Sequence, residues 1–441
     1  MQDWVPAMSA VTWADLPPET RRAAEVLIVD ALGIASVGRT APGVAAALTA
    51  WERDLGRGPV RLPFTRADLP APAAAAALSA LIHAWDFDDT HDTAVVHTSC
   101  VALPAALATA RTGADVLAGF VTGVQVLARV SAAVGGQAGM IRTASLGPLG
   151  AAAAAARTLG LPPDRFAAAL GLALPATGST MTRQVVAEGS PAKRLQPALA
   201  VQTGVTAALL AARDVPGPYG GLDGEYGVLR LRGDPEAAQA ALTAPGWEVT
   251  RLSLKPYPAC RYTHAAIAAV RGAPADGLEK AVVRVPEGAA YAMVARPFAW
   301  RGQPVADAQF SIPWLVAAAL LTGTVDLGTL RPEVLGDPRI EALAARVEVH
   351  QDLPARDGMA PAEVELAYAD GRAEHRRADM PGSPEHPLTL DQVRDKARTC
   401  ARAAGRDDGT ADRITDFATG LADHGADAVR AALTSIDTQE A

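Results

Sequence analysis

The feature that most constrains this chain is a polar segment, His83 to Cys100 (HAWDFDDTHDTAVVHTSC), set between Ala-rich apolar stretches. It contains three of the eight histidines and four aspartates, Asp86, Asp88, Asp89 and Asp92. Burying such groups is costly unless they hydrogen-bond one another. A single His–Asp pair between two helices would most simply belong to a solvated loop. At this density, we interpret the segment as the floor of a cleft.

The first half of the chain has the pattern of close-packed helices. Hydrophobic residues make up 49% of the 441 residues and aromatic residues only 5%, and no alternating strand pattern occurs before Trp247. We expect residues 135–150 (GGQAGMIRTASLGPLG) to be a flexible link and Thr177–Pro191 to be a loop. The helices expected here are Arg21–Val37, Gly43–Leu55, Ala71–His83, Ala102–Arg111, Ala114–Val134, Ala151–Leu159 and Arg194–Arg213.

Strand patterns begin near Trp247, where WEVTRLSLKPYP alternates like a strand entering a turn. Asp370-Gly371 is typical of a two-residue hairpin turn, and from Leu388 the helical pattern returns. Further strands are expected at Lys280–Val285, Arg346–His350, Glu363–Tyr368 and Arg372–Arg377, with helices at Thr263–Arg271 and Phe310–Leu321. The sequence therefore predicts a mainly α protein with two domains: a helical domain over 1–250, completed by 388–441, and a smaller α+β domain over 251–387.

Charge and cysteine content exclude several classes of function. The net charge of −8 is spread without a basic stripe, which argues against nucleic acid as a partner. Cys100, Cys260 and Cys400 are scattered and odd in number, as expected of free thiols in the cytoplasm. The N-terminus lacks the pattern of a signal peptide, and charged residues, Gly or Pro interrupt the apolar runs before about 18 residues, which argues against a membrane span.

Lysine is rare, with only Lys193, Lys255, Lys280 and Lys396 among 40 basic residues. In a chain so biased toward arginine, a kept lysine suggests a position that needs an amine able to lose its proton. Lys193 and Lys255 occur among Gly, Ser and Pro, where loops present side chains, so we take them as candidates. Lys280 and Lys396 occur in ordinary charged surroundings, and we expect no special role for them.

Four segments are expected to converge on one site: His83–Cys100, Met140–Gly150, Ser190–Gln196 and Lys255–His264. Two amines close together repel as cations, and burial favours the neutral amine, which can remove a proton next to a carboxylate. His97 is a candidate proton donor, and Asp86, oriented by neighbours such as Thr90, a candidate partner for an imidazole. The candidates for binding substrate carboxylates are Arg142, Arg183 and Arg261.

Four stretches in order resemble the successive signatures of the MmgE/PrpD family: WDFDDTHDTAVVH, GPLGAAAAAARTLGL, GSPAKRLQPALAVQTGVTAALLAARDVPGPYGGLDGEYG and KPYPACRYTH. The family includes 2-methylcitrate dehydratase, cis-aconitate decarboxylase and iminodisuccinate epimerase. The resemblance covers almost the whole chain. It implies a large helical domain with a smaller α+β lid, a homodimer, no cofactor and no metal, and an active site between the domains. It also implies that Asp86, Thr90, His97, Lys193 and Lys255 belong to that site.

The chain departs from the decarboxylase pattern at several of its positions. It is one residue longer between Thr90 and His97, and Ile141-Arg142 stands where a histidine precedes the Ala-rich helix. Cys260, in the segment that ends at His264, replaces a second histidine, and Trp314 replaces a tyrosine in the lid. We count Cys260, His264 and Trp314 as candidate substrate contacts. Because three candidate proton donors are missing, the departures argue against cis-aconitate decarboxylation.

The sequence leaves three functions open. The first is a cofactor-independent, dehydratase-like lyase that removes a proton next to a carboxylate of a small polycarboxylate or a related specialised metabolite. The second is an isomerase or epimerase of the iminodisuccinate epimerase type, which begins with the same proton abstraction. The third is a metal-dependent hydrolase, for which His83, Asp86, Asp89, His91 and His97 offer ligand atoms. An Ala-rich helical surface with few charges also favours a homodimer.

Overall fold

The computed structural model describes residues 4–134, 141–177, 184–232, 235–355 and 359–437, apart from some side chains near residue 235. The chain divides into two compact units. Unit 1 comprises Met1–Thr182, Arg194–Leu254 and Leu388–Ala441. Unit 2 comprises Arg183–Lys193 and Lys255–Pro387. Unit 1 is helical and unit 2 contains a four-stranded sheet, so the predicted fold class, a mainly α protein with an α+β second domain, is confirmed.

Unit 1 is built around helices that are apolar on nearly every side, as expected of helices in the middle of a core. Small residues let these helices approach closely: a Cβ on Gly123 of α6 would lie 2.7 Å from the Cβ of Ala154 in α7. The core helices are α2 Pro18–Gly38, α4 Ala71–His83, α5 Ser99–Ala108, α6 Gly113–Val134 and α7 Arg142–Thr158. Around them lie α1 Val5–Ser9, α3 Val44–Asp54, α8 Pro163–Ala173, α10 Ala192–Ala211, α11 Val228–Arg232, α12 Pro235–Thr243 and the 3-10 turn η2 Glu248–Arg251.

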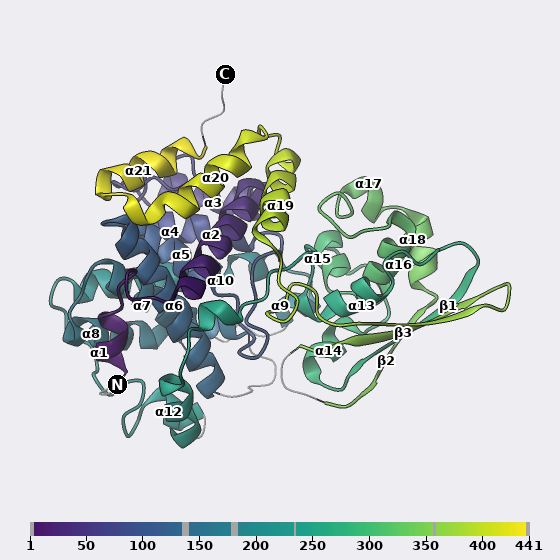
Figure 1. Cartoon of the computed structure of the whole chain (residues 1–441), viewed down its shortest axis with the longest axis horizontal. Helices are drawn as coiled ribbons and strands as arrows, with labels where there is room; N and C mark the ends of the chain where they lie inside the picture. The colour runs from purple at the N-terminus through teal and green to yellow at the C-terminus, as the bar shows by residue number, and fades with distance from the viewer. Residues whose placement is uncertain (1–3, 135–140, 178–183, 233–234, 356–358, 438–441) are drawn as a thin grey trace. The chain divides into compact units, whose positions relative to one another are not determined.

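The C-terminal helices complete unit 1. They are α19 Leu390–Ala403, α20 Gly409–Gly420 and α21 Ala426–Ser435, and Figure 1 shows α19 and α20, in yellow, lying along α2. A Thr389–Gln392 capping box starts α19, and its apolar face buries Val393, Ala397 and Cys400. Helices α19 and α20 therefore extend the core of unit 1 beside α2.

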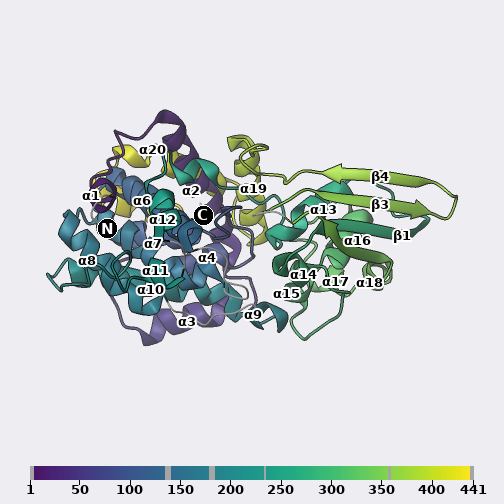
Figure 2. The ribbon, with the colours of Figure 1, turned by 90° about the horizontal axis from the view of Figure 1, so that it is seen from below.

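Unit 2 holds a sheet in the order β2-β1-β3-β4, with β1 and β2 parallel and the other two pairs antiparallel. Its strands are β1 Leu278–Pro286, β2 Val347–Leu353, β3 Ala362–Tyr368 and β4 Ala373–Ala378. Helices α13 and α16 pack on the sheet (Figure 2). Lys280 lies on the other face of the sheet, where its ammonium nitrogen is 2.8 Å from Glu348 Oε1. Its side chain is half exposed, as expected for a lysine without a special role. The helices are α9 Gln184–Ala187, α13 His264–Ala269, α14 Ala289–Val294, α15 Pro304–Gln309, α16 Ile312–Thr322, α17 Pro332–Leu335 and α18 Pro338–Ala344.

Three local predictions were wrong. Of the expected flexible link at 135–150, residues 142–150 are the first nine residues of α7, because Gly147 and Gly150 serve close packing on Ala200 and Leu127 rather than flexibility. Residues 135–140 lie outside the described part of the chain. The expected strand at Trp247 is the 3-10 turn η2, whose Glu248 faces inward. Lys193 lies in the first turn of α10, not in a loop.

Two predictions concern α6 and the cysteines. Helix α6 is long and apolar enough to cross a membrane, but 94% of its most apolar stretch is buried inside the protein, as in a core helix. Interruptions by Gly and Arg therefore do not make α6 too short or too polar to cross a membrane, contrary to the prediction from the sequence. All three cysteines are buried and none forms a disulfide, which confirms that none is bridged. Burial raises the pKa of the Cys400 thiol to about 12, so this thiol is inert near neutral pH.

Candidate active site

The polar segment His83–Cys100 lies across the first turns of three helices of unit 1. The Asp89 carboxylate accepts hydrogen bonds from the backbone N–H groups of Thr98 and Ser99, at 3.0 and 2.9 Å, where α5 begins. At the start of α7, Thr143 Oγ1 accepts the His97 backbone N–H at 3.1 Å, and Arg142 donates to the Ala94 carbonyl. At the start of α10, Arg194 Nε donates to the Ala84 carbonyl at 2.7 Å. The position of the segment is therefore set by three helix ends.

His97 is held in one tautomer. Its Nδ1 lies 2.9 Å from the Asp89 backbone carbonyl oxygen, which only accepts hydrogen bonds, so Nδ1 carries a proton. In the neutral ring the lone pair is then on Nε2, the atom able to exchange a proton with a substrate. Thr90 Oγ1 lies 3.5 Å from the same Nδ1. The ring is 16% exposed, so it is within reach of solvent and of small molecules.

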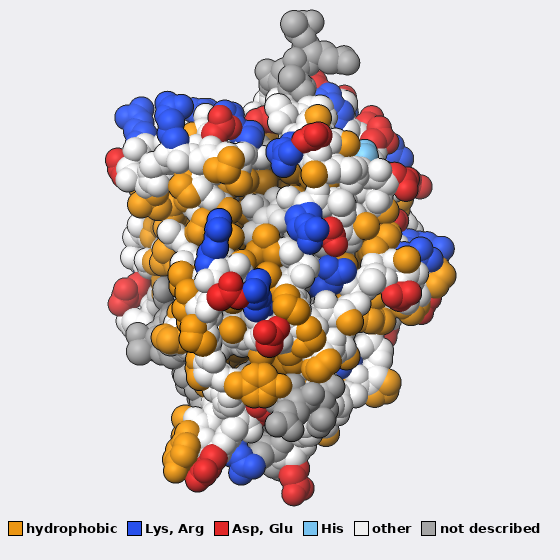
Figure 3. Space-filling view, turned by 90° about the vertical axis from the view of Figure 1, so that its left-hand side faces the viewer, with side chains coloured by type: hydrophobic (Ala, Val, Ile, Leu, Met, Phe, Trp, Pro, Cys, Tyr) orange, Lys and Arg blue, Asp and Glu red, His pale blue; other side chains and the backbone are white. Residues whose placement is uncertain are grey.

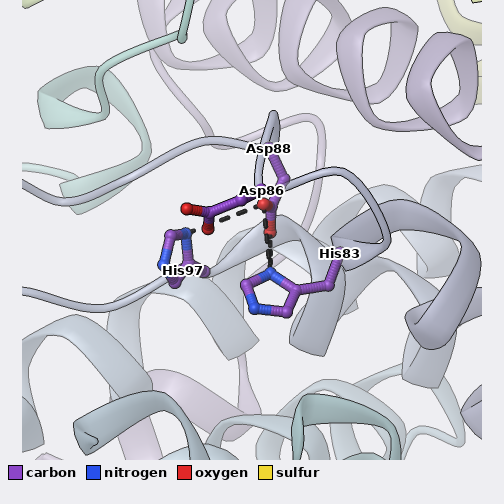
Figure 4. Close-up of side chains that lie close together, drawn as sticks. All are labelled: His83, Asp86, Asp88 and His97. Carbon is purple, nitrogen blue, oxygen red and sulfur yellow. Dashed lines mark hydrogen bonds and ion pairs between the residues drawn. The ribbon is translucent and has the colours of Figure 1, made fainter. Parts of the chain in front are cut away.

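Four side chains of the segment point toward one another: His83, Asp86, Asp88 and His97 (Figure 4). Each offers a nitrogen or oxygen within 4.8 Å of those of the others. His83 Nδ1 lies 2.9 Å from Asp88 Oδ2, and both side chains are fully buried. The His83 and His97 rings meet edge to face at 4.7 Å. Only His97 in this cluster is partly exposed, which makes it the member best placed for proton transfer.

The backbone of the segment is strained at two positions. Asp86 has φ 52° and Val95 has φ 55°. This left-handed region is uncommon for residues other than glycine and rare for β-branched residues such as Val95. Such conformations persist where the surroundings over-determine them, and they concentrate at functional sites. Burial lowers the pKa of the Arg194 guanidinium, and the nearby charge of Asp86 opposes that shift. Asp86 thus lies within electrostatic reach of Arg194, at the start of α10.

Asp89 and His91, two of the ligand types considered for a metal, are engaged elsewhere. Burial and the neighbouring charge of Asp88 raise the pKa of Asp89, although the bonds from Thr98 and Ser99 oppose this. His91 Nε2 lies 2.9 Å from Glu248 Oε2. The described residues that gather as possible metal ligands are His83, Asp86, Asp88 and His97.

The segment is also fastened to the stretch that leads out of unit 1. The backbones of Thr90 and Ser253 form two hydrogen bonds, at 2.9 and 2.8 Å, and Ser253 Oγ donates to Asp92 Oδ2 at 2.7 Å. Burial alone would raise the pKa of Glu248, but His91, Arg251 and Arg129 lower it below its usual value. An ionised, buried Glu248 therefore helps to hold residues 248–253 against the segment.

Lys396 was wrongly assigned to ordinary charged surroundings. Its ammonium group, on α19, lies 2.8 Å from Asp30 Oδ1, donates to the Phe87 carbonyl at 2.9 Å, and stands 3.8 Å from the centre of the Phe87 ring. Burial raises the pKa of Asp30 to about 6, although Lys396 opposes this shift. The lysine thus holds the backbone between Asp86 and Asp88 from the side of the C-terminal helices.

Unit 2 carries the other candidates. Lys255 is completely buried, and Lys193 is buried with its ammonium 5.6 Å from the centre of the Phe310 ring. Cys260 is buried, Arg261 donates to the Pro381 carbonyl, and His264 Nε2 lies 3.2 Å from the Ala259 carbonyl. Trp314 lies in α16 without exposure. Arg183 lies outside the described residues.

Within unit 1 the structure brings Asp86, Thr90 and His97 together, with Arg142 holding the same segment. The predicted roles of Lys193, Lys255 and the substrate contacts stay predictions. Sequence reasoning missed the parts played by Asp88, Arg194 and Lys396. A signal for Lys396 exists, because it falls three residues after Val393 and four before Cys400, on the buried face of α19.

The chain thus combines a helical unit, which holds a buried His–Asp cluster, with an α+β unit. The MmgE/PrpD N-terminal domain matches residues 5–240, and the MmgE/PrpD C-terminal domain matches residues 257–418. These matches cover most of the chain. The chain belongs to the MmgE/PrpD family, as its resemblance implied.

Curated relatives align over most of their lengths. The cis-aconitate decarboxylase-like protein oryM of Aspergillus oryzae is 26% identical, over 88% of this chain and 87% of its own. Cis-aconitate decarboxylase of Mus musculus is 26% identical, over 86% and 82%, and that of Homo sapiens 27%, over 76% and 73%. At these identities the relatives share the architecture, while individual site positions are free to differ.

Proposed function

We propose that this protein is a cofactor-independent lyase that removes a proton next to a carboxylate of a small polycarboxylate or a related metabolite. The family and the named lyases among its relatives support the reaction class. The acid in this proposal is His97, and the base is Lys193 or Lys255.

One observation carries the proposal: each candidate lysine lies within two residues of a residue that is hydrogen-bonded to the polar segment. Arg194, next to Lys193, is bonded to the Ala84 carbonyl. Ser253, two residues before Lys255, is paired with Thr90. Chain geometry alone keeps the Lys255 Cα within about 7 Å of the Ser253 Cα. The two lysines of this lysine-poor chain therefore branch from backbone tethered to the cluster that contains His97.

The chemistry balances in two transfers. The neutral amine takes the proton from the carbon next to the carboxylate, and the electron pair left behind forms the new double bond. A hydroxyl on the adjacent carbon leaves with a proton from the His97 imidazolium, as water. The amine ends protonated by the substrate's carbon-bound proton, and the imidazole ends neutral because its proton leaves in the water. Exchange of one proton with solvent at each group then restores the starting state.

The alternative is an epimerase or isomerase, which shares the first transfer but returns the proton to carbon. The relatives named decarboxylases supply a further outcome, loss of CO2. A screen of di- and tricarboxylates in deuterated water separates all of these. A new alkene with release of water supports the proposal, deuterium uptake without a new product indicates an epimerase, and CO2 release indicates a decarboxylase. No turnover and no exchange across the screen would overturn the proposal.

The cluster of His83, Asp86, Asp88 and His97 keeps a metal-dependent hydrolase as the second candidate, because its four ligand atoms lie within 4.8 Å of one another. Full activity after dialysis against a chelator is expected for the lyase. Activity lost with chelator and restored by Zn²⁺ or Mn²⁺ would favour the hydrolase.

We also propose a homodimer in the cytoplasm. Figure 3 shows broad apolar areas between scattered charged side chains on the face of unit 1 that carries α8. Unit 1 also exposes large apolar side chains, among them Tyr226 at 82% and Leu231 at 74%, which a second copy of the chain would shield from water. Light scattering at micromolar concentration is expected to give twice the chain mass of 45.3 kDa, and a monomeric mass would contradict the dimer.

A further inference from the structure

Gln196, in the second turn of α10, has a buried side-chain amide that makes no hydrogen bond to the described residues. The residue is 2% exposed, and neither its Nε2 nor its Oε1 has a hydrogen-bond partner among the described residues. A side-chain amide offers two donors and accepts with its oxygen, and leaving these groups unpaired in the interior is destabilising. Native proteins keep such groups where a ligand or an ordered water completes them.

The packing of α10 on α7 gives the location of this amide. A Cβ on Gly147 would lie 3.0 Å from the Cβ of Ala200, and a Cβ on Gly204 would lie 2.6 Å from the Cβ of Ala151. The two helices therefore run parallel, with 147 opposite 200 and 151 opposite 204. Continuing this register by one turn toward the helix N-termini, from 147/200 to 143/196, matches Gln196 with Thr143, because residues four apart share a helix face. Thr143 is the residue whose hydroxyl accepts the His97 N–H.

The first turns of α7 and α10 are themselves basic. Neither helix has an acidic residue in its first turn, whereas Arg142, Lys193 and Arg194 all lie there. The charge of Asp86, in the polar segment, offsets part of the positive charge at Arg194. Cations at helix N-termini are electrostatically unfavourable, because the helix dipole already places positive charge at that end. An anion bound there would relieve this repulsion. Side chains in helices lean toward the N-terminus, which directs the Gln196 amide toward these first turns.

We propose that the Gln196 side-chain amide donates a hydrogen bond to a carboxylate of the substrate, at the first turns of α7 and α10 next to His97. This rests on the proposed function, since it names a contact for the same substrate class. The amide selects a carboxylate by geometry as well as charge, and it holds the substrate carbon close to the imidazole. Gln196 is thus a substrate-binding and specificity-determining residue.

The test uses the full-length protein and calorimetric titration with cis-aconitate, citrate, propane-1,2,3-tricarboxylate and succinate as probes. Gln196→Met keeps the size and unbranched shape of the side chain but removes the amide. The variant is expected to bind the tightest probe at least about tenfold more weakly than the wild type, as for a lost bond to a charged acceptor. Its melting temperature is expected to stay equal or rise, because an unsatisfied buried amide is gone. Gln202→Met, six residues along the same helix and half-buried, is the matched control and should match the wild type in both measurements.

Gln196→Glu supplies a second variant, in which a carboxylate opposes the substrate carboxylate; it should bind the same probe more weakly still. Equal binding by Gln196→Met and the wild type would overturn the proposal and leave an internal water as the amide's partner, without touching the proposed function. A Gln196→Met variant that melts well below the wild type and binds normally would also overturn it. Failure of the wild type to bind any probe would instead overturn the proposed function together with this inference.

Discussion

The backbones of Thr90 and Ser253 are paired by two hydrogen bonds, with Thr90 N–H donating at 2.9 Å and Ser253 N–H at 2.8 Å. The two residues are far apart in the chain, yet this bridge joins the polar segment to the stretch that continues into Lys255. Arg194 forms the matching tether on α10 through the Ala84 carbonyl. Both Arg194 and Ser253 lie within two residues of a point where the chain passes from one unit to the other.

Substitutions at Ser253 test whether the bridge matters for activity. Proline lacks the N–H that donates to Thr90, whereas alanine keeps it and removes only the hydroxyl bonded to Asp92. Because small displacements of reacting groups cost up to about 10²-fold in rate, Ser253→Pro is expected to lower kcat at least about tenfold below Ser253→Ala. Steady-state kinetics with melting curves make the comparison. Equal kcat in two folded variants would show that the bridge does not position the site.

Lys396 is expected to act as a positioning residue. Lys396→Met removes the donor to the Phe87 carbonyl and leaves Asp30 unpaired in the core, which costs about 3–5 kcal/mol of unfolding free energy for a buried ion pair. The double variant Asp30→Asn/Lys396→Met should recover most of that stability, because no buried charge remains. It should still show a reduced kcat with a nearly unchanged KM. A double variant with wild-type kcat would limit Lys396 to a structural role.

The raised pKa of Asp30 predicts a pH dependence of stability. The group is protonated more easily in the fold, at about 6, than in the unfolded chain, at 3.8, so its contribution is complete at low pH and is lost as pH rises through about 6. From about pH 4.5 to about pH 7.5 the wild type should lose about 2 kcal/mol of unfolding free energy relative to Asp30→Asn. Urea denaturation at both pH values measures this. A difference that stays constant or grows with pH would contradict the assignment.

Much of the fold could be predicted because its signals are local. The period of the apolar residues located α2, α4 and α6, and Asp370-Gly371 located the β3–β4 hairpin, where Gly371 has φ 84°. Failures arose where tertiary packing reverses a local signal. Gly147 and Gly150 predict a break, yet they permit contact with α10 and α6. The alternation after Trp247 predicts a strand, yet Glu248 turns inward to meet His91 and Arg129.

The candidate site was predictable in its residue types rather than its contacts. The density of His and Asp indicated the cluster, and His97 and Asp86 belong to it. The division of labour within it depends on which groups meet: Asp89 caps α5, while Asp88 pairs with His83. Lys280 and Lys396 have similar neighbours in sequence, and only the packing of α19 against α2 separates an exposed lysine from a buried one.

The central claim is that a lysine amine removes the substrate proton. Lys193→Arg and Lys255→Arg keep the positive charge but remove the titratable base, since arginine does not lose its proton in proteins. Lys280→Arg, on the exposed face of the sheet, is the control and should be silent.

The most direct measurement is the rate at which each variant exchanges the substrate carbon-bound proton for deuterium, followed by NMR on the substrate found in the screen. At least one of Lys193→Arg and Lys255→Arg should fall by about 10²–10⁴-fold, with melting temperature and the Lys280→Arg rate unchanged. Near-normal exchange in both lysine variants would contradict the account, leaving the lysines as charge anchors and His97 as the group that takes the proton.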